Sequence, residues 1–441
     1  MLRITCLLLL LIPCLAASAP TAPPTPPAAR ASSQFDPQTA TNAWLATFPQ
    51  ANRARSDAYF EGGYWLILWD FLTTALVMIV VLETGLSARM RALAERWAGR
   101  PFLQIFLFWT LFQCFSALVL FPWTVYEGYF REHQYGLSNQ NFGGWFRDTF
   151  VSWLLLLVFG GLFAALLFAL IKKLPRTWHL WGAAAGIVFT IFAGMIAPVY
   201  IAPLFNTYTP LKDMRLKRKI LSLARQNGIP ARDVYEVDAS RQSKRVSANV
   251  SGLFGTERIT LNDNLLSRCS PEGVLATMGH EMGHYIMHHI ENAMLFFSVV
   301  IFIMFQVLRW GLETALARRG EHWGIHAVSD VAVLPLAVLI LATLGFLFTP
   351  IANTFTRAQE YEADIFGLNS ARQPDGEAEV DLLLGEYRKL DPKPWEEILF
   401  FDHPAGRTRI YAAMRWKAEN LCLFDVRLPC ANPAPTVRAE Q

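Results

Sequence analysis

Two histidines four residues apart, with a glutamate directly after the first, carry the clearest chemical signal in the sequence. The stretch from His280 to His284 reads His-Glu-Met-Gly-His, the pattern HExxH. Residues i and i+4 share one face of a helix, so both imidazoles can be directed at one Zn²⁺, while Glu281 can reach a water at the metal's open position. The spacing therefore predicts metal-assisted hydrolysis with Glu281 as the general base.

The residues that precede the motif predict that it lies on a helix. Ser270 is a favoured N-cap, Pro271 fits the first helical position, and Glu272 places a negative charge in the first turn. Taken alone, the motif also fits two surface histidines on a helix beside a membrane.

A catalytic zinc needs a third protein ligand, which HExxH does not contain. The residues after His284 lack the glycine and third histidine of the metzincin extension. Further along, Glu360 and Asp364 lie one helical turn apart in a helix-compatible segment, Asn353 to Phe366. This spacing suits a carboxylate ligand and a second acid that orients a ligating histidine. Alone, the pair also fits a solvated acidic helix face.

The composition indicates a membrane protein. Hydrophobic residues make up 53% of the 441 residues and charged residues only 17%, whereas soluble domains carry about 25% charged residues. The net charge of +3 is small and the cations are scattered, which excludes a nucleic-acid-binding surface. The six cysteines form no CxxC pair, so any metal must be held by histidine and carboxylate.

Six apolar runs are long enough to span a bilayer, which takes about 20 residues. They are Tyr64–Leu86, Phe102–Phe121, Phe150–Ile171, Trp178–Tyr200, Asn292–Leu308 and Val331–Thr349. The fifth run is short, and Asp70 interrupts the first, where it is expected to face the interior or the end of the span. The predicted fold class is an all-α polytopic membrane protein with a small α+β domain that carries the chemistry.

The chain divides into seven predicted parts. Its start has the composition of a secretory signal peptide, although Pro13 and Pro20 also fit an uncleaved signal anchor. The parts are a signal peptide or anchor (1–19), a Pro-rich exported tether (20–57), four spans (58–203), the first part of the zinc peptidase domain (204–291), two spans (292–349), its second part (350–416) and a tail (417–441). The tether is expected to be disordered at its start, because Pro/Ala/Thr-rich sequence cannot build a core.

Basic residues predict the orientation. Arginines and lysines gather in the loops after the first, third and fifth spans, which the positive-inside tendency places in the cytoplasm. Both polar stretches, 201–291 and 350–441, then lie on the exported side. The site is thus predicted to face the periplasm of a bacterial inner membrane, where a disulfide between Cys422 and Cys430 can persist.

Ordered motifs between residues 58 and 416 resemble the type I CAAX prenyl protease family of integral-membrane zinc peptidases. The motifs are HExxH at 280–284, Glu-x-x-x-Asp at 360–364, Pro203–Asn206 with Thr209–Leu211, Glu132–Asn141, the approach through Pro350, Asn353 and Thr356–Arg357, and His403–Pro404 with Arg409. The resemblance implies a ring of seven helices around a water-filled intramembrane chamber, closed at one end by a gluzincin-like zinc domain. The N-terminal segment would supply the seventh helix.

The resemblance also implies a role for each site residue. One Zn²⁺ per chain is expected on His280, His284 and Glu360, with Glu281 as base and Asp364 behind the ligands. His403 and Arg409 are expected to approach the metal and the substrate carbonyl, where either would stabilise an oxyanion. His288 and His289 are expected to be interfacial side chains.

Two departures bear on the substrate. Ser247-Ala248-Asn249 replaces the family's usual Asn-Ala-Tyr, on a predicted strand that would pair with the substrate backbone. The family's eukaryotic members also face the cytosol, whereas the charge pattern here exports the site, so CAAX-prenyl processing is not expected. The predicted partners are the lipid bilayer and an extended or unfolded polypeptide, membrane-associated ones included. The sequence leaves the oligomeric state open.

Three other functional classes remain open from the sequence. A site-2-type intramembrane protease also uses HExxH, but places it inside a span instead of after a polar, capped helix start. A transporter could use the same polytopic body but has no need of HExxH. A zinc-binding quality-control scaffold would bind polypeptides without cutting them.

Overall fold

The computed structural model describes residues 23–251 and 258–428. Within them, six helical segments are long and apolar enough to cross a membrane. Their bounds are Gln50–Glu83, Pro101–Gln134, Phe142–Lys173, Trp178–Leu204, His289–Trp323 and Val331–Ala371. Each predicted span falls on one of them, which confirms the polytopic helical fold. The first predicted span runs past the end of its helix, because Gly85 turns the chain with a φ of +65°.

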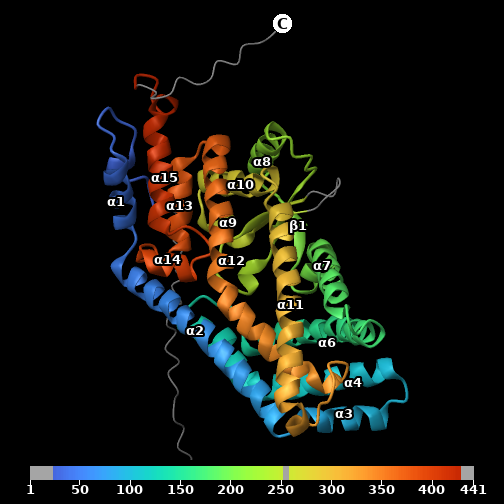
Figure 1. The fold of residues 1–441 in the computed structure, drawn as a ribbon. Helices are drawn as coiled ribbons and strands as arrows, with labels where there is room; N and C mark the ends of the chain where they lie inside the picture. Colours follow the sequence, from blue (N-terminus) through green and yellow to red (C-terminus); the bar gives the residue numbers. More distant parts are fainter. Residues whose placement is uncertain (1–22, 252–257, 429–441) are drawn as a thin grey trace, which may run out of the picture.

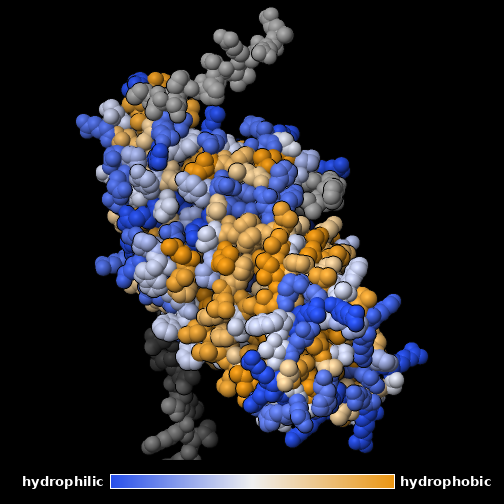
Figure 2. Space-filling view, viewed as in Figure 1, coloured by the Kyte–Doolittle hydropathy of each residue, from blue (hydrophilic) through white to orange (hydrophobic). Residues whose placement is uncertain are grey.

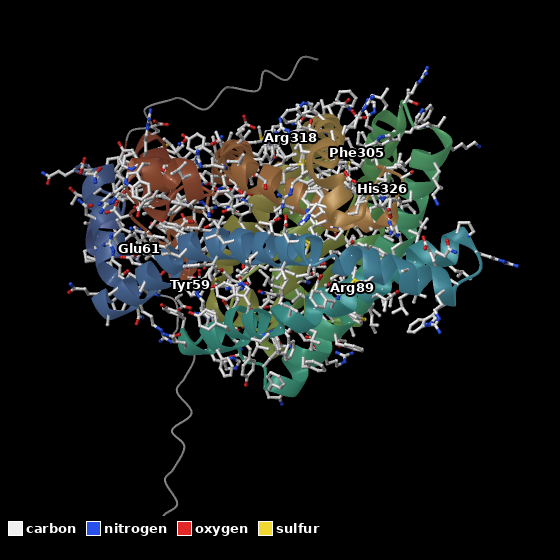
Figure 3. All side chains as sticks on the ribbon, turned by 60° about the horizontal axis from the view of Figure 1, so that its bottom comes forward. Tyr59, Glu61, Arg89, Phe305, Arg318 and His326 are labelled. Atoms are coloured by element: carbon white, nitrogen blue, oxygen red, sulfur yellow. The ribbon has the colours of Figure 1, made fainter. Side chains whose placement is uncertain are left out.

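The spanning helices form one half of the molecule, called here the membrane half (Figure 1). Its elements are α2 (Gln50–Glu83), α3 (Leu86–Trp97), α4 (Pro101–Val125), a π-helical turn (Tyr126–Arg131), α5 (Glu132–Gln134), α6 (Phe142–Lys173), α7 (Trp178–Ile196), a second π-helical turn (Ala197–Ile201), α11 (His289–Trp323) and α12 (Leu334–Ala371). Figure 2 shows apolar side chains gathered over these helices, between polar surfaces at both ends. Figure 3 shows Tyr59 and Glu61 near one end of α2 and Arg89 beyond its other end.

Aromatic and aliphatic side chains fill the interior of the membrane half. Phe108, Phe112, Phe168 and Trp178 are among its fully buried residues. Large apolar side chains also point outward, and Leu118 is 76% exposed. Apolar side chains on both faces of a helix are expected where hydrocarbon replaces water as the solvent, because only the backbone must then be satisfied internally.

The second half, called here the sheet half, lies at one end of the spans and contains the only sheet in the described residues (Figure 1). Its elements are β1 (Tyr208–Pro210), α8 (Met214–Gln226), β2 (Val234–Val237), β3 (Ala248–Ser251), β4 (Arg258–Asn262), α9 (Asp263–Arg268), α10 (Pro271–Ile286), α13 (Pro374–Leu384), α14 (Pro394–Phe400) and α15 (Gly406–Glu419). The strand order is β1-β2-β4-β3; β2 and β4 are parallel and the outer pairs antiparallel. The predicted strands near Ala248 and Arg258 are β3 and β4, so β3 is an edge strand.

One helix joins the two halves. The predicted boundary at residue 350 falls inside α12, which continues from the sixth span through Pro350 to Ala371. Glu360 and Asp364 therefore sit on the extramembrane continuation of a spanning helix. A continuous helix has little freedom to bend except at a proline, so the position of these two carboxylates is fixed by the membrane half.

The prediction of a tether at 20–57 is wrong for its described part. Residues Pro37–Thr47 form α1, which begins at Asp36 as N-cap and packs against α15. Trp44 and Leu45 are buried in this contact. The physical reason is that Asp-Pro starts a helix and Ala40 and Trp44 fall on one face, signals that outweigh the Pro-rich composition around them.

Several predictions concern residues outside those described. The signal peptide or anchor at 1–19, and with it the seventh helix, lies there, as do Cys430 and so the proposed disulfide. These remain predictions.

Candidate metal centre and active site

Two helices packed closely together position the motif residues. The Ser270 hydroxyl caps α10 as predicted, accepting from the backbone N–H of Gly273 at 3.1 Å. Where α10 crosses α12, glycine faces glycine: a Cβ added to Gly367 would lie 2.8 Å from the backbone nitrogen of His280. Only this close approach of the two backbones brings the histidines of α10 against the carboxylates of α12.

The structure brings together the three predicted ligands. His280 Nε2 lies 3.1 Å from His284 Nε2 and 3.2 Å from Glu360 Oε2. His284 Nε2 is 3.6 Å from Glu360 Oε1. Ligand atoms from all three residues lie within 4.8 Å of one another. The cluster has the donor set that a catalytic zinc takes in gluzincin-type sites, two imidazoles and one carboxylate.

The hydrogen bonds around the cluster fit a cation at its centre. His280 Nδ1 is 2.8 Å from Asp364 Oδ1, a carboxylate that can only accept, so the ring proton sits on Nδ1 and Nε2 presents a lone pair. Glu360 Oε2 is buried and accepts no hydrogen bond from the residues that the structure describes. Lone pairs converge there without protons between them, an arrangement that costs free energy unless a cation compensates it.

Arg409 contacts Asp364 and also lines a pocket shared with His280 and Glu281, so its approach to the substrate carbonyl stays a prediction. Its Nε and Nη2 donate to the two oxygens of Asp364 at 2.8 and 2.6 Å. Nη2 also reaches Glu377 at 3.2 Å, and Nη1 lies 3.0 Å from Asp381. Every nitrogen of the guanidinium is therefore engaged by a carboxylate. Arg409 thereby holds Asp364 against His280.

The carboxylates around Arg409 are buried together. Glu377 and Asp381 come from α13 and are 4% and 1% exposed. Burial raises the pKa of both, and the Arg409 guanidinium opposes the rise. One cation thus compensates three buried acids, which makes the group costly to disrupt.

The position of His289 differs from the prediction. Instead of lying at the interface, it is 3% exposed, and its Nδ1 is 2.9 Å from His284 Nδ1. Its Nε2 is 3.2 Å from Glu362. His289 therefore orients His284 much as Asp364 orients His280. His288 is exposed, as predicted.

Glu281 and His403 face a pocket in front of the ligand cluster. The pocket has a volume of about 170 Å³, and its wall includes Ala248 of β3 and Arg388. Burial raises the pKa of Glu281, and His280 and His284 oppose the rise. His403 Nε2 lies 3.2 Å from Glu360 Oε2, so the prediction that His403 approaches the metal ligands agrees with its position.

The predicted loop 132–141 anchors the chain leading into β3. Glu132 accepts from Tyr59 of α2 at 2.6 Å and from Arg245 at 2.9 Å. Arg245 in turn donates to the Tyr59 hydroxyl at 2.6 Å. The edge strand beside the pocket is thereby fixed to two helices of the membrane half, α2 and α5.

Three residues at the site, Glu377, Asp381 and Arg388, were not named by the sequence reasoning, and the contact of His289 with His284 was missed. His289 could have been found from its place five residues after His284. For the acids of α13 and for Arg388 no local pattern exists, because their neighbours in space come from distant parts of the chain.

An HExxH helix held against a third-ligand helix that continues from a membrane span defines an integral-membrane metallopeptidase. Comparisons with known proteins agree. Residues 210–417 match the model of peptidase family M48, and residues 38–207 match a model described as CAAX prenyl protease N-terminal, five membrane helices.

The chain is 30% identical over 339 residues to a Bacillus subtilis protein described as uncharacterized metalloprotease YhfN, covering 76% of this chain and 79% of that one. It is 27% identical over 329 residues to CAAX prenyl protease 1 of Saccharomyces cerevisiae, covering 70% and 72%. The crystal structure of S. mikatae Ste24p superposes with a TM-score of 0.68 at 23% identity, covering 86% and 88%, which shows a shared fold. The chain belongs to peptidase family M48 and is a multi-pass membrane metalloprotease, which confirms the family resemblance of its motifs.

Proposed function

We propose that this protein is a zinc endopeptidase that hydrolyses extended or unfolded polypeptides at the edge of the membrane. One observation carries the proposal: Nε2 of His280, Nε2 of His284 and the carboxylate of Glu360 converge without a proton donor between them. Bound there, Zn²⁺ would polarise the scissile carbonyl and lower the pKa of a water to about 7.

The chain's own residues would supply the remaining steps. Glu281 lines the pocket beside the ligands and would take a proton from the attacking water, then pass it to the leaving amine. Asp364 and His289 would keep the two imidazoles in the tautomers that ligation requires. His403 lines the same pocket, 3.2 Å from Glu360, and would approach the substrate carbonyl.

The substrate is expected to lie along β3. This strand is at the edge of the sheet, with one side paired to β4, and Ser247 and Ala248 line the pocket. An edge strand binds an extended peptide through main-chain groups, with little demand on side chains. Unfolded segments would therefore be cut and tightly folded domains excluded. The cleavage of prenylated CAAX proteins indicated by the names of relatives is not part of this proposal.

The proposed orientation has the sheet half in the periplasm of a bacterial inner membrane. Its support is the distribution of lysine and arginine over alternate loops. An alkaline-phosphatase fusion after residue 441 should then be active in cells, and Cys422 and Cys430 should resist thiol labelling until reduced. An inactive fusion together with full labelling would show the opposite orientation.

The hydrolysis itself is tested with the purified protein in detergent and a quenched fluorescent reporter in two forms. The first form is an unfolded polypeptide and the second carries the same sequence inside a stable domain. Chelation should abolish cleavage of the unfolded form and Zn²⁺ should restore it, while the folded form should persist. A scaffold would bind the unfolded form without cutting it, and equal cleavage of both forms would contradict the edge-strand mode.

A further inference from the structure

Arg388 differs from every other cation close to the ligand cluster. Arg409 is 8% exposed and has a carboxylate at each nitrogen. On either side of Arg388 in sequence, Glu386 pairs with Arg268, and Lys389 pairs with Glu61 and Glu396. Within residues 23–251 and 258–428, no carboxylate oxygen lies within 4.0 Å of the Arg388 guanidinium. A half-buried guanidinium without an anion has donors to offer to a ligand.

The backbone of Arg388 is fixed where the chain leaves α13. Its N–H donates to the carbonyl of Leu384 at 2.9 Å, and its own carbonyl accepts from the Ser56 hydroxyl at 3.3 Å. The side chain lines the same pocket as Glu281 and His280. The backbone is thus anchored beside the pocket, and the guanidinium is positioned by its contact with His403. Electrostatic catalysis requires donors that are positioned in advance in this way.

The contacts of His403 leave Arg388 as the less committed of the two side chains. His403 Nδ1 is 2.8 Å from Asp402 Oδ1. Its Nε2 lies 3.2 Å from Glu360 Oε2 and 3.4 Å from Arg388 Nη2. Both ring nitrogens of His403 therefore already have partners. Of the two guanidiniums that line the pocket, that of Arg409 is paired with carboxylates, and that of Arg388 has no carboxylate partner among the described residues.

We propose that Arg388 is a catalytic residue, whose guanidinium donates hydrogen bonds to the substrate carbonyl oxygen as that oxygen gains negative charge. This is the role that the family resemblance implied for His403 or Arg409. It rests on the proposed peptide hydrolysis. The water oxygen bonds to the carbonyl carbon, the π electrons move to the oxygen facing Arg388, and Glu281 takes the water proton. The C–N bond then breaks, the oxygen returns its charge, and the amine leaves with the proton from Glu281. Arg388 stays protonated throughout.

The experiment compares wild type, Arg388→Met and Arg388→Gln, with Arg415→Met as a matched control. Arg415 is an exposed arginine on α15 that pairs only with Glu419 of its own helix in the described chain. Loss of an oxyanion donor lowers kcat by about 10² to 10³-fold. Both Arg388 variants should show that loss with KM within about threefold of wild type. Their affinity for a phosphonamidate peptide, a tetrahedral anion, should fall with kcat/KM, while zinc content stays the same.

Two further measurements keep the outcome decisive. The affinity for the uncleaved peptide, measured in a Glu281→Gln background, should not change when Arg388 is replaced, because the contact forms only as charge develops. Hydrolysis by wild type that Glu281→Gln abolishes establishes the proposed function separately from Arg388. If that holds, the proposal on Arg388 is overturned by a kcat within threefold of wild type in either folded variant, or by a loss confined to KM with unchanged phosphonamidate affinity.

Discussion

The two sides of the ligand cluster are built on opposite principles. The rear of the site, Asp364, Glu377, Asp381 and Arg409, is at most 8% exposed, and its guanidinium is saturated with carboxylates. The front, Glu281, Arg388 and His403, lines a pocket that Arg409 and Glu377 also reach, and the Arg388 guanidinium has no carboxylate partner among the described residues. Saturated buried groups fix positions, whereas unsaturated ones at a cavity are available to a substrate. Substitutions at the rear should therefore change metal affinity and stability, and substitutions at the front should change turnover.

The largest effect is expected at the ligand that both sides share. Glu360→Ala removes one of three protein ligands. It should lower both zinc affinity and activity by more than about 10³-fold, because both depend on the complete set of ligands. Zinc content by atomic absorption and peptide hydrolysis should fall together. Full zinc stoichiometry with full activity in this variant would show that Glu360 is not a ligand.

At the rear, Arg409→Met should destabilise the protein strongly. Removing the only cation of a buried ionic group leaves Asp364, Glu377 and Asp381 uncompensated, a cost of about 3 to 5 kcal/mol. The cost should depend on pH. Burial already raises the pKa of Glu377 and Asp381, and without the arginine it should raise both further. The stability that protonated Glu377 and Asp381 contribute in this variant is then fully present below the unfolded carboxyl pKa of about 4. It is lost as the pH rises through their pKa values in the folded state.

Thermal unfolding followed by tryptophan fluorescence checks this prediction. The gap in Tm between wild type and Arg409→Met should narrow as pH falls from 8 toward about 5, because the carboxyls bind protons in the folded state. Arg415→Met should show no gap. A gap that stayed constant over this range would mean that the variant loses packing and not charge compensation.

Asp364→Asn sharpens the division between rear and front. The amide keeps the volume but removes the charge that holds the proton on His280 Nδ1. Loss of such a partner lowers metal affinity by about 10 to 100-fold, measured by chelator competition. At saturating zinc the variant should recover most of its kcat. An unchanged kcat deficit at saturating zinc would place Asp364 in the reaction itself.

The smallest effect concerns the contact between α10 and α12. In Gly367→Ala the new methyl would lie 2.8 Å from the His280 nitrogen, whereas Gly345, on the same helix, has nothing within 4 Å. Overpacking of this kind costs about 1 to 3 kcal/mol and should weaken zinc binding, since it separates the histidines from Glu360. Gly345→Ala is the matched control. Equal behaviour of the two variants would show that the close backbone contact does not position the site.

Local spacing made part of the site predictable from the sequence. HExxH after a capped helix start and Glu360 one turn before Asp364 are short-range patterns, and the structure brings both together on facing helices. The six spans were predictable for a similar reason, since length and hydropathy of one segment are sufficient evidence for a spanning helix.

What the sequence could not show depends on neighbours in space. The pairing of Arg409 with Glu377 and Asp381 could not be predicted, because both acids lie on a helix whose burial no local pattern reveals. His289 was misplaced because a histidine at the start of a spanning helix usually lies at the interface. The tether was wrong for a different reason: the helix signals at Asp36 and Pro37 were present, and composition was given more weight than they were.

The most direct test of the account is Glu281→Gln. Glu281 faces the pocket and is not among the three residues that converge on the metal position. The account predicts one bound zinc per chain, wild-type thermal stability and a loss of hydrolysis of about 10² to 10⁴-fold, the usual contribution of a general base. Hydrolysis at the wild-type rate, or zinc lost together with activity, would contradict it.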